Sequence, residues 1–244
     1  MKERISDLSD RTLKTWQVQC TPFLSPPELA EAIADLGRLT DVQFVAWGGY
    51  AQAERQKLAI APSELALTSD CIPLSALRIR GNFLFDPASH RDFLGAILST
   101  GIERDEVGDV IVLGETGAQA IASPHIAEYL ELQLTQVRTV PVKTQIIPIS
   151  ELKIRPPQKQ EIITTEASLR LDAVASAGFA MSRSKMVGLI KNEELRVNWQ
   201  YVSSPSHQLR SGDLVTLRGR GRLEIGEIAI TKKHRYRIQM WRIS

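Results

Sequence analysis

The chain has 244 residues, of which 43% are hydrophobic and 24% are charged, which is the composition of an ordinary globular protein. No apolar run approaches the roughly 20 residues that cross a bilayer. We therefore expect a cytoplasmic protein without membrane insertion. Residues 1–150 carry 13 Lys and Arg against 19 Asp and Glu, a net charge of −6, whereas residues 151–244 carry 17 against 9, a net charge of +8. A basic segment on an acidic body is typical of proteins that bind phosphate backbones, because cations near phosphates release condensed counterions, although unevenly scattered surface charge would give the same numbers.

The first segment, residues 1–69, is predicted to be a small α/β module. Ser25, followed by two prolines and Glu28, is typical of a capped helix start, and Gly37 is typical of a helix end. Alternating apolar residues then indicate a strand that stops at a pair of glycines. The expected elements are a helix over 26–36, a strand over 42–47 and a short helix over 51–57.

Residues 70–148 are predicted to form a ferredoxin-like domain, the fold that RNA-recognition motifs also use. The expected elements, in order, are one strand or two short ones over 74–85, a helix over 90–100, strands over 107–113 and 118–122, a helix over 124–137 and a strand over 140–147. RNA-recognition motifs stack bases on aromatic side chains of their central strands, and the strand over 118–122 has none. We therefore expect a scaffold here, or a surface for a protein partner on the acidic N-terminal domains, rather than a platform for RNA.

Three prolines and several charges between residues 147 and 159 predict a semi-rigid linker, which we place at 149–160. Residues 161–230 are then expected to hold two short helices followed by a small sheet. The helices are expected over 168–178 and 181–191, the strands over 195–199, 214–217 and 223–225, with a basic, glycine-punctuated crossing over 218–222. The tail, 231–244, is predicted to be a basic extension beyond this domain.

Five short motifs in this region carry a specific resemblance. They are Arg170-Leu171-Asp172, Ser182-Arg183-Ser184-Lys185, Leu189-Ile190-Lys191, Val197-Asn198 and Gly212-Asp213. In this order and spacing they resemble the S4 RNA-binding domain, an αL-type fold of two packed helices that lead into a small curled sheet. Each motif is weak alone, but five in register make the resemblance specific.

A second resemblance extends over about residues 20–230. Residues 90–98, 101–104 and 108–110 resemble the middle domain of the YlmH family, whose members also end in an S4 domain and carry a stretch like Arg218 to Arg222. Within that family the chain most resembles the cyanobacterial and plastid branch of photosystem II S4 domain proteins. The resemblance implies an α+β protein of three small modules that acts in ribosome-associated quality control on stalled large subunits. For the photosynthetic branch it implies a role in photosystem II assembly or plastid translation.

The residues expected to bind RNA are basic or polar. The first turn of the second helix offers unpaired backbone N–H groups and the positive end of the helix dipole, which attract a phosphate. Arg170, on the first helix, should share this face, and arginines at alternate positions from 218 to 222 would project to one side of an extended chain. The predicted RNA-binding residues are Arg170, Ser182, Arg183, Ser184, Lys185, Lys191, Asn198, Arg218, Arg220 and Arg222.

Less specific interpretations of the same residues stay open. Asp172 is expected to orient Arg170 or to cap its helix rather than to act chemically. Asn198 fits a turn at least as well as an RNA contact. Arg183 and Lys185 could be solvated surface charges only.

No catalytic or metal-binding pattern emerges from the sequence. Cys20 and Cys71 lack a C-x-x-C spacing, and residues 114–119 lack the Gly-Lys-Ser/Thr of a P-loop. Pseudouridine synthases with an S4 domain carry their catalytic Asp in a larger domain that has no counterpart here. We expect a non-catalytic protein without cofactor or metal that docks on structured rRNA of the large subunit, or on tRNA held there. The alternative is an RNA-modifying enzyme that uses the S4 domain as a targeting arm.

Overall fold

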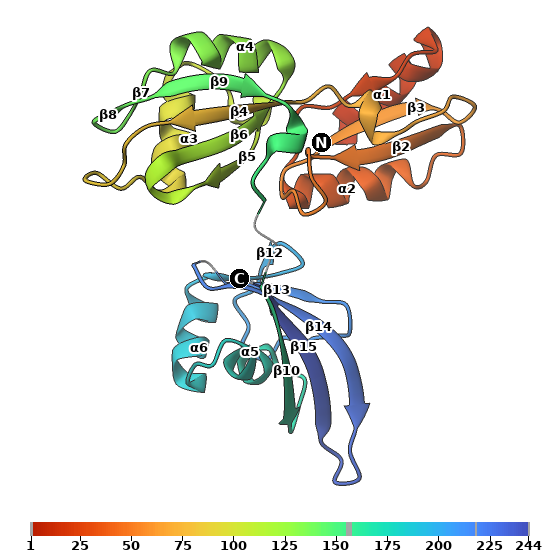
Figure 1. Cartoon of the computed structure of the whole chain (residues 1–244). Coiled ribbons are helices and arrows are strands. Elements are labelled where there is room, and N and C mark those ends of the chain that lie inside the picture. The colour runs from red at the N-terminus through yellow and green to blue at the C-terminus, as the bar shows by residue number, and fades with distance from the viewer. Residues whose placement is uncertain (1, 155–157, 218, 244) are drawn as a thin grey trace. The chain divides into compact units, whose positions relative to one another are not determined.

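The protein folds into two compact units, Met1–Ile154 and Arg155–Ser244 (Figure 1). The computed structural model describes residues 2–154, 158–217 and 219–243. Three separate hydrophobic cores are present, two in the first unit and one in the second. Each core joins helices to an antiparallel sheet, which confirms the expected α+β class and its three modules.

The N-terminal module of the first unit packs two helices against a three-stranded sheet of order β1-β3-β2. Its elements are α1 (Lys2–Thr15), β1 (Gln19–Cys20), α2 (Pro26–Leu36), β2 (Val42–Trp47), β3 (Lys57–Pro62) and the 3₁₀ turn η1 (Ser69–Cys71). The backbone N–H of Ser25 donates to Glu28 at 2.7 Å, as the predicted capping box requires. Helix α1 was not expected, because its buried face includes the polar Ser9 and Thr12 beside Ile5.

The short helix predicted over 51–57 is wrong. Residues 51–56 form a loop that ends in a bridge at Gln56, and Lys57 already begins β3. The N–H groups of Glu54 and Arg55 donate to the carboxylate of Asp109 in the middle module, at 2.7 and 3.0 Å. Tyr50 donates to the same carboxylate at 2.7 Å. A distant acceptor therefore replaces the local bonds that a helix would have made.

The middle module has the predicted βαββαβ order. Its elements are β4 (Ser75–Arg80), α3 (His90–Ser99), η2 (Arg104–Glu106), β5 (Val107–Val112), η3 (Gly114–Thr116), β6 (Gly117–Ala122), α4 (Pro124–Gln133), β7 (Gln136–Val137), β8 (Val140–Pro141), β9 (Lys143–Ile147) and η4 (Ile149–Glu151). The antiparallel sheet has the order β5-β6-β4-β9, and α3 and α4 pack on one of its faces (Figure 1). The predicted helix end at 137 and the single strand over 140–147 differ from this, because β7 and β8 pair with each other around a turn at Arg138, whose φ is 54°.

The first residues of the predicted linker belong to the first unit. Gln119 in β6 donates to the carbonyl of Glu151 at 2.9 Å and accepts from the backbone N–H of Lys153 at 2.6 Å. Arg78 in β4 pairs with the Glu151 carboxylate at 2.5 Å. At the other end, β10 begins at Lys159, and residues 155–157 lie outside the described chain. The linker is therefore shorter than the predicted 149–160.

The second unit packs two helices on a six-stranded sheet of order β10-β15-β14-β13-β11-β12. Its elements are β10 (Lys159–Glu166), α5 (Leu171–Gly178), α6 (Arg183–Lys191), β11 (Leu195–Val197), β12 (Gln200–Tyr201), β13 (Leu214–Leu217), β14 (Gly221–Ile230) and β15 (Tyr236–Ile243). Helix α5 approaches the sheet closely, since a Cβ on Gly178 would lie 2.3 Å from Leu223 Cδ1.

The predicted C-terminal extension is part of this sheet. Strand β15 lies between β10 and β14 and pairs with both. Ile238 and Met240 are fully buried in the core, and as alternate residues of a strand they point to the same face. The prediction of an extension outside the domain was wrong because only two alternating apolar residues signal the strand, and basic and polar residues surround them.

Candidate nucleic-acid interface

Two arginines meet at one buried carboxylate between α5 and α6. Arg170 is the N-cap residue of α5, directly before the helix rather than within it, and Arg183 is the first residue of α6. The Asp172 carboxylate accepts from Nε and an NH2 group of Arg170 at 3.0 and 3.1 Å. It accepts the same two donors of Arg183 at 3.1 and 3.2 Å. The expected orienting role of Asp172 toward Arg170 is therefore observed, and it extends to Arg183.

The burial of these three side chains is unequal. The Asp172 side chain is only 4% exposed, whereas those of Arg170 and Arg183 are 36% and 58% exposed. A guanidinium has five N–H donors, of which each arginine uses two on Asp172, so the remaining donors stay available to a ligand. The arrangement holds two guanidinium groups in fixed positions at the surface, which suits bidentate contact with phosphate oxygens.

Electrostatics keep this carboxylate ionised. Desolvation by burial is the largest influence on the pKa of Asp172 and would raise it, but the hydrogen bonds from Arg170 and then Arg183, with their charges, hold the pKa below its ordinary value. The hydrogen bond to Asp172 in turn raises the pKa of Arg170. With two cations against one anion, the cluster keeps a net positive charge.

The first turn of α6 adds further groups beside Arg183. The Ser182 hydroxyl caps the helix by accepting the backbone N–H of Lys185 at 3.4 Å, and it lies 3.4 Å from the Ser184 hydroxyl. All three side chains are exposed. A sharp turn at Ala180, with φ of 52°, starts α6 directly after α5. The structure thus brings Arg170 and Arg183 together at Asp172 and puts Ser182, Ser184 and Lys185 in the N-cap and first turn of the same helix as Arg183.

Lys191 and Asn198 do not join this group. Lys191 is the last residue of α6, about 12 Å along the helix from its first turn. Asn198 and Trp199 have φ of 49° and 69°, as the two-residue turn between β11 and β12 requires. The Asn198 amide donates to Asp213 at 2.8 Å and accepts from the N–H of Leu214 at 2.9 Å. This geometry favours the turn interpretation over an RNA contact.

The arginine-glycine segment is not an extended crossing. Arg220 is exposed in a tight turn between β13 and β14, where Gly219 and Gly221 have φ of 73° and 94°. Arg222 lies in β14, and its guanidinium sits 5.1 Å from the centre of the Trp199 ring. Arg218 lies outside the described residues. For Arg220 and Arg222 the predicted alternation along an extended chain is not observed, because Gly219 and Gly221 are left-handed and reverse the chain.

Comparison with known proteins gives family matches along most of the chain. Family models match three consecutive stretches: "YlmH, N-terminal" over residues 2–65, "Putative RNA-binding domain in YlmH" over 72–151, and "S4 domain" over 169–215. A Bacillus subtilis (strain 168) protein named "Ribosome-associated protein quality control protein P2" is 34% identical over 224 residues, which is 91% of this chain and 86% of that protein. The chain belongs to the YlmH family.

Two further similarities agree with the domain content of this YlmH-family protein. "Small ribosomal subunit protein uS4" of Desulfotalea psychrophila is 37% identical over 60 residues, 24% of this chain and 29% of that protein. The solved structure "Cell division protein ylmH from Streptococcus pneumoniae" superposes with a TM-score of 0.54 and 20% identity, covering 63% of this chain and 92% of that chain. At that identity the structure supports the fold alone. The protein is thus an RNA-binding member of a ribosome-associated family, whereas its photosynthetic branch stays a prediction.

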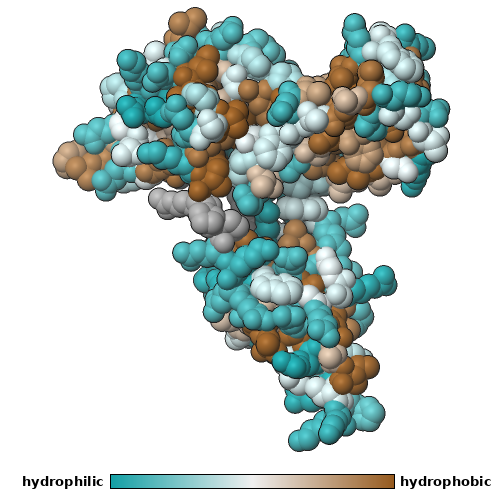
Figure 2. Space-filling model, turned by 45° about the vertical axis from the view of Figure 1, so that its right-hand side comes forward, coloured by the Kyte–Doolittle hydropathy of each residue, from teal (hydrophilic) through white to brown (hydrophobic). Residues whose placement is uncertain are grey.

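The structure also shows basic surface in this YlmH-family protein that the sequence argument did not include among the predicted RNA-binding residues. The guanidinium of Arg196 lies 4.3 Å from the centre of the exposed Tyr201 ring on the β11–β12 hairpin. The β14–β15 hairpin projects from the second unit (Figure 1), and its tip in Figure 2 is hydrophilic. Residues 232–235 at that tip are three cations and a histidine, all exposed. The signal in the sequence was the run Lys232-Lys233-His234-Arg235, which resembles a tail when its flanking strands go unrecognised.

Within the part of the chain that the structure describes, no helix is both long and apolar enough to span a bilayer. No group of three or more His, Cys, Asp or Glu side chains that could hold a metal ion occurs among those residues. Cys20 is half-buried, Cys71 is exposed, and both are free thiols.

Proposed function

We propose that this protein is a non-catalytic, cytoplasmic factor that docks through its S4 domain on structured RNA of the large ribosomal subunit, either rRNA or tRNA held there, and that it serves ribosome-associated quality control. The name of the Bacillus relative supports the process, and the S4 match supports the RNA ligand. A part in photosystem II biogenesis remains a prediction from the branch resemblance alone.

The observation that carries the proposal is the pair of exposed guanidiniums held by buried Asp172 beside the first turn of α6. Cations in fixed positions recognise the spacing of phosphates on a folded RNA without reading bases. Arg170, Arg183 and Lys185 offer three phosphate contacts. Each contact adds about 0.9 to the slope of log affinity against log salt concentration, so we expect binding to weaken steeply with salt.

Charge reversal tests the assignment. The double variant Arg183→Glu and Lys185→Glu should lose co-sedimentation with ribosomes while its circular dichroism spectrum stays unchanged, because both side chains are exposed and Arg170 still pairs with Asp172. Arg11→Glu with Lys14→Glu, on the exposed face of α1, makes the same change of charge and should co-sediment normally. Equal co-sedimentation of both double variants would contradict the proposal.

The non-catalytic part has a separate test. An RNA methyltransferase needs S-adenosylmethionine and an ATP-dependent RNA-modifying enzyme needs a nucleotide, so S-adenosylmethionine and ATP are titrated into the full chain by calorimetry. We expect no saturable heat with either. Stoichiometric binding would favour the enzyme alternative, in which the S4 domain is a targeting arm.

A further inference from the structure

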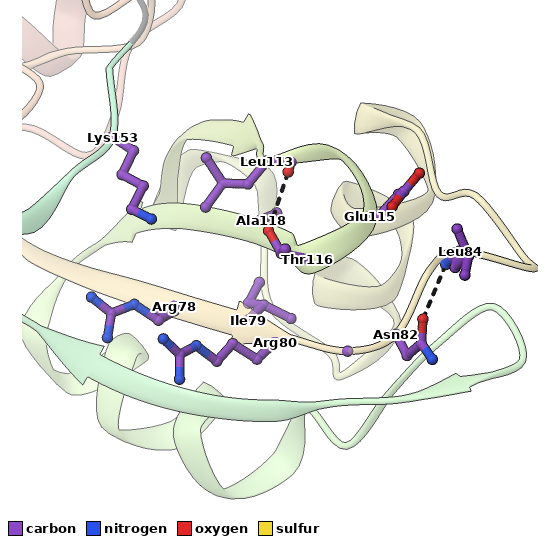
Figure 3. Close-up of a pocket in the computed structure, with 11 residues that line it drawn as sticks. Arg78, Ile79, Arg80, Asn82, Leu84, Leu113, Glu115, Thr116, Ala118 and Lys153 are labelled. Atoms are coloured by element: carbon purple, nitrogen blue, oxygen red, sulfur yellow. Dashed lines mark hydrogen bonds between the residues drawn. The ribbon is translucent and has the colours of Figure 1, made fainter.

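Pockets on the surface of the first unit differ in the chemistry of their linings. One, of about 610 Å³, lies at one end of the middle module's sheet, where Arg78 and Arg80 leave β4 in the same direction and Lys153 extends from the segment after η4 (Figure 3). Among the described residues that line it there is no thiol. Another pocket, of about 470 Å³, lies beside α1 and includes Cys20, the last residue of β1. Cys20 is half-buried, so this pocket gives small reagents access to it.

The Cys20 thiol lies next to the other cysteine of the chain. Its Sγ is 3.8 Å from the carbonyl oxygen of Cys71, to which it donates a weak S–H···O bond, although the two residues are 51 positions apart. A carbonyl oxygen is about 2.4 Å from the Cα of its own residue by standard bond lengths, so the Cys20 sulfur lies within about 6.2 Å of the Cys71 Cα. The fold therefore makes neighbours of two cysteines that the sequence keeps far apart.

Cys71 can make the remaining approach that a disulfide requires. Its side chain is exposed, so the sulfur can turn about the Cα–Cβ bond without displacing other groups. Cys71 ends the 3₁₀ turn η1, where its N–H bonds to the carbonyl of Thr68 and that of Ile72 bonds to Ser69. A short surface turn held by such local bonds can shift by the roughly 2 Å that still separates this geometry from a bonded one. Cys20, which pairs with Ala59 in the sheet, stays in place as the fixed partner.

The two thiols differ in reactivity. Burial raises the pKa of the Cys20 thiol, the positive charge of Lys57 lowers it in part, and the neighbouring Cys71 raises it again. A raised pKa leaves less of the thiolate, which is the reactive form, whereas Cys71 is open to reagents from solvent. The exposed thiol therefore reacts first with a dissolved oxidant, and the half-buried thiol then reacts with the sulfur beside it.

We propose that Cys20 and Cys71 form a redox modification site, at which a small disulfide such as oxidised glutathione converts the two thiols into one internal disulfide. The Cys71 thiolate attacks one sulfur of oxidised glutathione, which forms a mixed disulfide and releases one glutathione. The Cys20 thiolate then attacks the Cys71 sulfur, which closes the internal bond and releases the second glutathione. The two cysteines lose two electrons and two protons, and both end on the two reduced glutathione molecules. Excess reduced glutathione reverses the two steps.

The disulfide ties the end of β1 to the segment that leads into β4. It closes a loop that contains α2, β2 and β3, and a crosslink over so long a loop removes conformational freedom mainly from the unfolded chain. Oxidation thus makes the N-terminal module more resistant to unfolding. The site belongs to the first unit and does not depend on the docking function proposed for the S4 domain.

The test treats the reduced full chain with oxidised glutathione and follows its intact mass and its peptides under non-reducing conditions. We expect a product lighter by two hydrogen atoms, with a peptide that links Cys20 to Cys71, and a rise in melting temperature of about 5 °C that reduction reverses. Cys20→Ser should stop at a glutathione adduct of Cys71, and Cys71→Ser should form an adduct at Cys20 more slowly. The control Cys71→Ser with Ser99→Cys keeps two thiols, one at an exposed position on α3, and should take up glutathione without closing an internal bond.

Three outcomes would overturn the proposal. The first is wild-type protein that carries glutathione on both cysteines and no internal disulfide. The second is a disulfide that links two chains, which a non-reducing gel detects. The third is oxidised protein that melts at or below the temperature of the reduced protein. The melting comparison uses one sequence in two redox states, so damage from a substitution cannot imitate its result.

Discussion

Replacing Asp172 with Asn tests whether the S4 arginines work by position or only by charge. The carboxylate is 4% exposed and accepts four N–H bonds from two guanidiniums. Asn keeps the size but exchanges one acceptor oxygen for an NH2 donor, so at least two of the four bonds are lost. Such bonds contribute about 1.5–3 kcal/mol each when fully buried, but the partner guanidiniums are partly solvated, so we expect a total loss of about 1–2 kcal/mol of unfolding free energy in urea titrations.

The effect on RNA distinguishes the two explanations. Removing an anion from a phosphate-binding surface should tighten RNA binding if net charge alone matters. We expect binding about tenfold weaker instead, because the two arginines lose their fixed positions and ordering them then costs free energy on binding. Glu194→Gln, at an exposed site after α6, makes the same change of charge without touching the cluster and should bind at least as well as the wild type. Tighter or equal binding by Asp172→Asn would refute the positioning argument.

The dependence on pH gives the same variant a second readout. The folded pKa of Asp172 lies below its ordinary value of 3.8, because the two arginines outweigh the desolvation that raises it. A depressed carboxylate pKa contributes stability that is present above the unfolded value and is lost as pH falls through the folded one. The difference in unfolding free energy between wild type and Asp172→Asn should therefore be constant near neutral pH and shrink below about pH 3.8. A gap that persists to the lowest measurable pH would mean that lost packing, and not the ion pairs, causes the difference.

Three further substitutions probe the packing of a helix, a turn and a cross-strand pair. Gly178→Ala should cost about 1–3 kcal/mol in urea unfolding, because its Cβ would meet a leucine of β14 at 2.3 Å, whereas Gly188→Ala, with nothing within 4 Å, should add about 0.5–1 kcal/mol. Asn198→Ala should lose about 1–2 kcal/mol through its positive φ and two hydrogen bonds while RNA affinity stays within twofold, and a larger drop in affinity would restore Asn198 as an RNA contact. Lys143→Glu turns the repulsive cross-strand pair with Arg80 into an attractive one, so thermal unfolding should show a gain of about 0.5 kcal/mol, and a loss of stability would contradict this reasoning.

Elements marked by local signals were predictable from the sequence. The capping box of α2 and the apolar face of α3 depend on residues three or four positions apart, so the chain itself encodes them. The βαββαβ order follows from the same kind of pattern. The 51–57 loop was not predictable in this way, because its backbone bonds go to Asp109, more than fifty residues away.

In the candidate site, too, some features follow from the local sequence and others depend on residues that are distant in the chain. Sequence motifs identified Arg170, Arg183 and Lys185, because motif order and residue type are properties of the chain. They did not reveal that one carboxylate holds both arginines, since Asp172 and Arg183 meet only when α5 packs on α6. Arg80 and Lys143 were not singled out at all, because only the pairing of β4 with β9 brings their charges together.

The amino-acid sequence by itself determined the class of fold, the family and the residues that we predict to face RNA, because periodicity, capping and motif spacing act over a few positions. Only the tertiary structure decided which cations share a surface and which are already paired. It also showed that the apparent basic tail contains strand β15, which pairs with a strand on each side. The physical reason is that charge and hydrogen bonding act through space, so partners far apart in the chain become visible only once the chain has folded.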